Sequence, residues 1–147
     1  MIELTAMENQ RNDLLAGVLI EVGRSALQYM GECWPWTGSD EQGNVLKQLI
    51  QNQAAHVPVL VGLLGDRRQL IDFGTYPTEY TDLHYTGVDF LLSLLVQNQT
   101  ALVGILEKAV TESGSDADAN VLLTQILAQE RENLERLSNL EPEEASK

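Results

Sequence analysis

Cysteine, aromatic residues and positive charge are all scarce in this chain. Cys33 is the only cysteine, so a disulfide within the chain is excluded. Aromatic residues make up 5%, and no long run alternates apolar with polar residues, which argues against a β-sheet domain. Lys and Arg number 9 against 22 Asp and Glu, so the formal charge is -13 at pH 7. Because nucleic acids and anionic membranes attract basic patches, we expect neither as a partner.

Long apolar runs and the common catalytic motifs are missing as well. The longest apolar stretches, Val57–Leu64 and Phe90–Val96, fall well short of the ~20 residues that a membrane span needs. The first residues show no basic region followed by an apolar run, which a signal peptide would have. We therefore expect a cytoplasmic protein. There is also no glycine-rich phosphate loop, nucleophile elbow or paired-cysteine metal site.

Helical periodicity is what the chain does contain, in four long segments. The predicted helices cover about residues 5–31, 39–65, 82–112 and 115–140. Capping boxes are expected at Thr5 with Glu8 and at Ser39 with Gln42. Pro58 lies inside the second helix and is expected to kink it, because proline lacks the backbone donor. We expect one domain over residues 1–140 and a disordered acidic tail over residues 141–147.

The connections between these segments predict how the helices are arranged. The links near residues 32–38 and 113–115 are short, whereas residues 66–81 form a long link. A short link joins antiparallel neighbours, and a long link can span the bundle and join parallel helices. About 16 mostly extended residues can cover the ~38 Å length of such a helix. The sequence therefore predicts an all-α, antiparallel four-helix bundle with a long crossover between helices two and three.

Polar residues interrupt the apolar faces of these helices near their middles. Gln53 and His56 lie three apart on the second helix, and Glu130 and Asn133 lie three apart on the fourth. This spacing directs both members of a pair to one helix face. Counting at ~1.5 Å per residue puts further polar residues at the same level: Glu21 on helix one, and Gln97 and Asn98 on helix three. All four helices are thus expected to contribute polar groups to one mid-bundle layer.

In this layer the chain resembles the ferritin-like superfamily, over almost its whole length. That family holds two irons with a Glu on helices one and three and a Glu-x-x-His motif on helices two and four. The resemblance implies that Glu21, His56 and Glu130 match family ligands. Neutral residues stand at the remaining ligand positions: Gln53, Gln97 or Asn98, and Asn133.

The charge of this layer bears on which ions it can hold. Glu21 and Glu130 supply two carboxylates, whereas two divalent ions carry four positive charges. Uncompensated charge in a core costs several kcal/mol per ion, so a standard di-iron centre is disfavoured. Three interpretations stay open. One is a functional dinuclear site that uses unexpected ligands. A metal-free polar layer, with Gln53, Asn98 and Asn133 as its amides, would fix helix register.

Alternatively, Glu21, His56 and Glu130 hold one Fe, Mn or Zn ion, since carboxylate and imidazole ligands suit these metals. The protein would then be a metal-dependent oxidoreductase or an iron-handling protein.

The third predicted helix also bears on oligomeric state. It is apolar nearly all round over Phe90–Val96. One bundle is not expected to bury every side of a helix. We therefore predict a homodimer formed through this helix, most simply a twofold one.

Overall fold

The computed structural model describes residues 6–34, 36, 38–85 and 87–140, and all regular structure in these residues is helical. The elements, in chain order, are α1 (Ala6–Gly23), α2 (Ala26–Cys33), α3 (Asp40–Ala54), α4 (His56–Asp66), the 3-10 helix η1 (Thr78–Tyr85), α5 (Val88–Glu112) and α6 (Ala117–Ser138). The prediction of an all-α chain is confirmed. The cap predicted at Thr5 and the tail over 141–147 lie outside the described residues.

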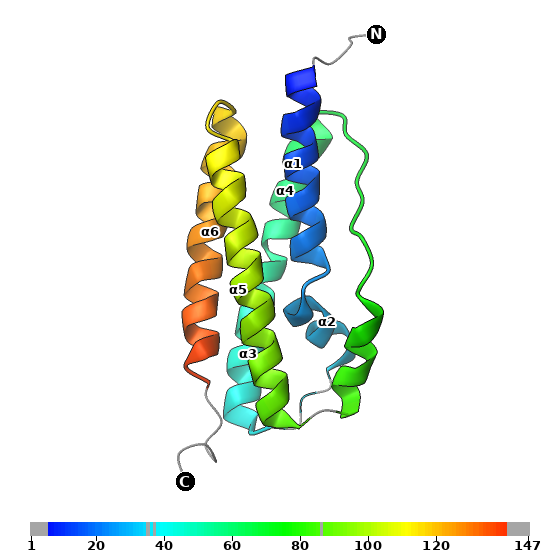
Figure 1. Ribbon diagram of the computed structural model, residues 1–147, viewed down its shortest axis with the longest axis vertical. Helices are drawn as coiled ribbons and strands as arrows, with labels where there is room; N and C mark the ends of the chain where they lie inside the picture. The colour runs from blue at the N-terminus through cyan, green and yellow to red at the C-terminus, as the bar shows by residue number, and fades with distance from the viewer. Residues whose placement is uncertain (1–5, 35, 37, 86, 141–147) are drawn as a thin grey trace.

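The helices form four columns that lie side by side (Figure 1). One column is α1 followed by α2, the next is α3 followed by α4, and α5 and α6 are single columns. The α5–α6 contact is the most extensive, and further contacts join α1 to α4, α2 to α3, α3 to α6, and α1 and α2 to α5. Neighbouring columns run antiparallel, because the segment after α4 returns along the length of the molecule before α5 begins (Figure 1).

The first column is broken, where a continuous helix to Gly31 was predicted. α1 ends at Gly23 and α2 begins at Ala26, with Ser25 as its N-cap. The Ser25 hydroxyl accepts a hydrogen bond from the backbone N–H of Gln28 (3.3 Å), and the Asn98 side-chain oxygen on α5 accepts one from Ala26 N–H (3.0 Å). A new helix can start here because these side chains satisfy its first donors.

The second column is interrupted close to the predicted kink. α3 ends at Ala54 and α4 begins at His56, while Ala55 keeps helical backbone angles (φ -63°, ψ -20°). Pro58 has no N–H to donate to the carbonyl of Ala54, which explains why regular helical bonding fails just before it. The column therefore passes from α3 to α4 without an intervening loop. The kink at Pro58 stays a prediction.

The other helix ends follow from local capping and from the aromatic residues of the crossover. The predicted capping box of Ser39 and Gln42 is confirmed, with bonds of 3.2 and 3.3 Å. Asp116 caps α6, with its side chain accepting a hydrogen bond from the backbone N–H of Ala119 (3.3 Å). α5 begins at Val88 and not near residue 82, because Thr78–Tyr85 forms η1. Tyr80 of η1 packs against Tyr29 of α2, with ring centroids 5.5 Å apart, which holds this end of the crossover against the bundle.

Two apolar clusters fill the interior, one at each end of the bundle. One is built by α1, α4, the second half of α5 and the first half of α6. The other is built by α2, α3, η1, the first half of α5 and Leu137 at the end of α6. Along α5, Leu95 belongs to one cluster and Leu102 to the other, with buried Gln99 between them. A polar layer therefore separates two apolar halves.

The apolar helix α5 is covered more fully than predicted. Leu91, Leu92 and Leu95 are buried, and of the stretch Phe90–Val96 only Phe90 is a largely exposed apolar residue (59%). The expected surplus of apolar surface there is thus mostly absent, since α2 and η1 pack onto that end. The predicted homodimer stays a prediction.

By length and composition alone α5 could cross a membrane, with a mean hydropathy of 1.4 over its most apolar stretch. Core helices of soluble proteins pass the same test, so this is weak evidence of a membrane span.

Candidate functional site

The polar layer is centred on the carboxylate of Glu130, in the middle of α6. Its side chain is 0% exposed, as are Gln53 on α3 and Asn133 on α6. Gln99 on α5 is 1% exposed, and His56 at the start of α4 is 12% exposed. A carboxylate removed from water in this way is strongly unfavourable unless its lone pairs are satisfied.

Four side chains satisfy both oxygens of Glu130. Oε1 accepts hydrogen bonds from the amide nitrogens of Gln53 (2.7 Å) and Gln99 (2.9 Å). Oε2 accepts from Asn133 Nδ2 (2.9 Å) and contacts His56 Nε2 (2.9 Å). An ionised carboxylate accepts only, and all four partners can donate. The arrangement therefore suits an ionised Glu130 and a His56 that carries hydrogen on Nε2.

An outer ring of polar groups orients the Gln53 amide. The Gln53 side-chain oxygen accepts from the Ser25 hydroxyl (2.6 Å) and from Gln28 Nε2 (3.0 Å). With its oxygen engaged on that side, Gln53 must turn its NH2 group toward Glu130.

The Asn133 and Gln99 amides are oriented in the same way. Gln129 Nε2 (3.1 Å) and Asn52 Nδ2 (3.5 Å) donate to the Asn133 side-chain oxygen. Gln99 donates a further bond to the backbone carbonyl of Glu130 (3.1 Å) and accepts one from Gln53 (3.3 Å). The cluster, through its outer ring, connects α2, α3, α4, α5 and α6.

The structure brings together four of the residues that the sequence nominated: Gln53, His56, Glu130 and Asn133. It also adds Gln99, which counting along the predicted helix missed in favour of Gln97 or Asn98. Its spacing could have identified it, because Gln99 falls in the buried series Leu92, Leu95, Leu102 and Leu106 with steps of three and four. Gln97, by contrast, is exposed.

Glu21 and Asn98 lie elsewhere. Both line a separate hollow beside the α1–α2 break, and Asn98 is committed to Ala26 N–H and to the Tyr80 hydroxyl (2.9 Å). The predicted ligand set of Glu21, His56 and Glu130 is therefore not assembled. Within the described part of the chain, no group of three or more His, Cys, Asp or Glu side chains could hold a metal ion.

The donor set around Glu130 does not fit a two-ion centre. It offers one carboxylate and one imidazole, and the amides point their NH2 groups at the carboxylate. An amide can ligate a metal only through its oxygen, which in Gln53 and Asn133 faces the outer ring. Metal binding would thus require these amides to rotate and to give up their outer hydrogen bonds.

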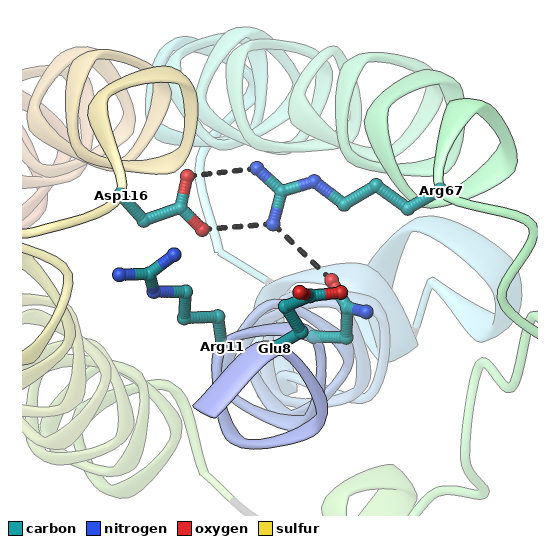
Figure 2. Close-up of a pocket in the computed structure, with 5 residues that line it drawn as sticks. Glu8, Arg11, Arg67 and Asp116 are labelled. Atoms are coloured by element: carbon teal, nitrogen blue, oxygen red, sulfur yellow. Dashed lines mark hydrogen bonds and ion pairs between the residues drawn. The ribbon is translucent and has the colours of Figure 1, made fainter. Parts of the chain in front are cut away.

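A second polar cluster lies at one end of the bundle, between α1, the end of α4 and the start of α6 (Figure 2). Arg67 forms a two-pronged ion pair with Asp116, with both N–O distances 2.8 Å, and donates to the Asn12 side chain (3.2 Å). These hydrogen bonds from Arg67 lower the pKa of Asp116; burial opposes the shift and the N–H of Ala119 adds to it. The pKa of Arg67 is raised, first by the same hydrogen bonds.

This end cluster borders a hollow of about 240 Å³ that Glu8 and Arg11 also line. Two guanidinium groups and two carboxylates balance in charge, so no net charge is left to attract an ion. We interpret the cluster as a clamp that ties together three columns.

Comparisons with known proteins give no further assignment: no protein-family model, curated protein or solved structure gives a significant match to this chain.

Proposed function

We propose that this chain is a ferritin-like four-helix bundle in which a hydrogen-bonded carboxylate replaces the metal centre, and that it serves as a structural or binding bundle without redox turnover. The arrangement of the columns supports the first half of the proposal. Short links join antiparallel neighbours, and one long crossover precedes α5, as in ferritin-type bundles.

The observation that carries the proposal is the complete satisfaction of Glu130. All four of its hydrogen bonds come from side chains, and three of the donors are neutral amides. A carboxylate that serves as a metal ligand usually has, before the metal binds, one oxygen that is free or hydrogen-bonded to water. Here both oxygens are saturated in a site that is 0% exposed, so the layer is complete as a polar network.

The role that this network supports is structural. Gln53, Gln99 and His56 lie on other helices and can bond to Glu130 in only one axial alignment of those helices with α6, because hydrogen bonds tolerate little change in distance. The two apolar clusters, which lie on either side, have no such directional requirement. The layer therefore fixes the register of the columns, and any binding activity would reside on the outer surface or in the peripheral hollows.

Metal analysis tests this proposal directly. Protein purified without chelator or a metal-binding tag should contain no stoichiometric Fe, Mn or Zn, and Fe(II) added under air should be oxidised no faster than in buffer. Stoichiometric metal that is lost on His56→Ala or Glu130→Ala would overturn the proposal. Glu132→Gln is the matched control, since it removes an exposed carboxylate from the same helix.

Restoring family ligands tests the position of the layer. Gln53→Glu, Gln99→Glu and Asn133→His together should create a site that binds Fe(II) or Zn(II), because the layer would then hold three carboxylates and two imidazoles. Titration calorimetry with metal compares this variant with the parent protein. If the folded triple variant binds no more tightly, the layer does not occupy the metal position of a ferritin-like bundle.

A further inference from the structure

A small hollow lies where α1 breaks, between the end of α1, η1 and the middle of α5. Its volume is about 80 Å³. Its polar lining is formed by Glu21, Arg24, Ser25, Tyr80 and Asn98, and its apolar side includes Ile105. The volume is about half that of a cavity of ~150 Å³ that holds benzene, so only a molecule of a few heavy atoms fits.

The break in the helix builds this hollow. Asn98 caps α2 through Ala26 N–H, which lets the chain turn away after Arg24. The crossover then passes closely over the end of α1 at Gly74, where φ is +71°. A Cβ at Gly74 would lie 2.7 Å from Ile20 Cγ2 and 3.6 Å from Arg24 Cδ. The crossover thus confines the stem of Arg24 beside the hollow.

Two opposite charges line this hollow without pairing. Among the described residues, neither the Arg24 guanidinium nor the Glu21 carboxylate makes a hydrogen bond or an ion pair within 4.0 Å. They are one helical turn apart, a spacing at which they could have paired. By contrast, Arg67 and Asp116 form an ion pair with an N–O distance of 2.8 Å.

A buried hydroxyl completes the polar lining. Tyr80 is 8% exposed, and its oxygen accepts from Asn98 Nδ2 at 2.9 Å. Within the described residues its own hydrogen has no acceptor. Burial raises the pKa of Tyr80, the Asn98 bond and the charge of Arg24 lower it, and the charges of Glu21 and Glu79 raise it. The charges of Arg24 and Glu21 therefore both act close to this hydroxyl.

We propose that this hollow binds a small zwitterion, namely an amino acid with a minimal side chain such as glycine or alanine. The ligand carboxylate would accept from Arg24 and from the Tyr80 hydroxyl, and its ammonium group would donate to Glu21. Guanidinium groups recognise carboxylates well, and hydrogen bonds between charged groups are the strong ones. A methyl group would contact Ile105. Ser25 borders both this hollow and the Glu130 cluster, but binding here does not depend on the proposed function.

The other ligand classes fit less well. A simple anion would face the carboxylate of Glu21, and a metal cation would face the guanidinium of Arg24. A larger metabolite exceeds the volume. A molecule that carries both charges a few bonds apart is the class that satisfies both groups.

Titration of the labelled full-length chain with glycine and with L-alanine tests the proposal. Saturable NMR shifts of the Arg24 and Asn98 side-chain N–H signals are expected, with a Kd on the order of 1 mM. Arg24→Gln and Glu21→Gln should each weaken binding at least about tenfold. The control Arg131→Gln removes an exposed arginine that pairs with Glu107 on the surface and should leave the Kd unchanged.

Small ions that carry only one of the two charges distinguish a zwitterion site from a simple ion site. Acetate and methylammonium each carry one of the two charges and should bind at least about tenfold more weakly than glycine. Equal binding of acetate would overturn the proposal, as would the absence of saturable shifts at roughly ten times the expected Kd. Tyr80→Phe provides a second variant if either charge substitution prevents folding, and it too should weaken binding.

Discussion

Replacement of Glu130 by glutamine is the sharpest test of the buried cluster. The change is nearly isosteric, but it removes the charge and turns one accepting oxygen into an NH2 donor. The best orientation keeps the new oxygen toward Gln53 and Gln99 and directs the new NH2 group toward His56 and Asn133. His56 can accept that bond by moving its hydrogen to the other ring nitrogen. Asn133 cannot accept a hydrogen bond from the new NH2 group, because its own NH2 group points toward residue 130.

The expected loss follows from these contacts. Two hydrogen bonds to a charged acceptor become neutral, and each weakens by about 1 kcal/mol. The NH2 group of Asn133 loses its acceptor, which costs about 1–3 kcal/mol. Glu130→Gln should therefore lower the free energy of unfolding by about 3–5 kcal/mol, the range found when one partner of a buried pair is removed. This is a large share of the ~5–15 kcal/mol that holds a typical domain together.

Urea unfolding followed by circular dichroism measures this loss. The m-value should stay the same, because the same surface is exposed on unfolding. Glu132→Gln is the control and should change stability by no more than about 0.5 kcal/mol, since Glu132 is exposed. A loss below about 1 kcal/mol for Glu130→Gln would refute the reasoning, because it would mean that Glu130 is not an ionised acceptor at the centre of the network.

Three further substitutions test other parts of the fold by the same unfolding assay. Asp116→Asn should cost about 2 kcal/mol at neutral pH. Folding lowers the pKa of Asp116, so its contribution to stability is present above the unfolded pKa of about 3.9. The difference in unfolding free energy between Asp116→Asn and the parent should therefore shrink below about pH 4. A difference that stays constant with pH would contradict the ion pair. Asn98→Ala should cost about 2 kcal/mol, since Ala26 N–H and the Tyr80 hydroxyl lose their partner, and a neutral result would mean that water replaces it fully. Gly74→Ala should cost about 2 kcal/mol through its positive φ and its contact with Ile20, whereas a stabilised variant would show that the crossover can shift.

Features that depend on a few neighbouring residues were predictable from the sequence. The capping box at Ser39 and the cap at Asp116 each join atoms within three residues, so the local pattern contains all the information needed. The i, i+3 spacing likewise placed Gln53 with His56, and Glu130 with Asn133, on the same faces. Because these faces are apolar, their polar residues had to find partners in the interior.

Features that depend on distant residues were not predictable in the same way. The break at Ser25 is stabilised by Asn98, which lies 72 residues away in the chain, and no proline marks it. Glu21 lies on α1 before this break and outside its buried series of Leu15, Val18, Leu19 and Val22. Gln99 replaced its neighbours in the layer because a rotation of about 100° per residue decides which side chain enters the core. Counting residues along a helix predicts the position of a side chain along the helix axis. It does not predict the direction in which that side chain points around the axis.

The sequence by itself determined that the chain is helical, where its capped helices begin, and that a polar layer crosses the bundle, because periodicity and capping are local. Only the tertiary structure decided which polar groups meet: Glu130 at the centre of four donors, Glu21 beside a separate hollow, and α5 covered by the tyrosine-bearing crossover. The physical reason is that hydrogen bonds require partners within about 3 Å, and the packing of whole helices sets these distances.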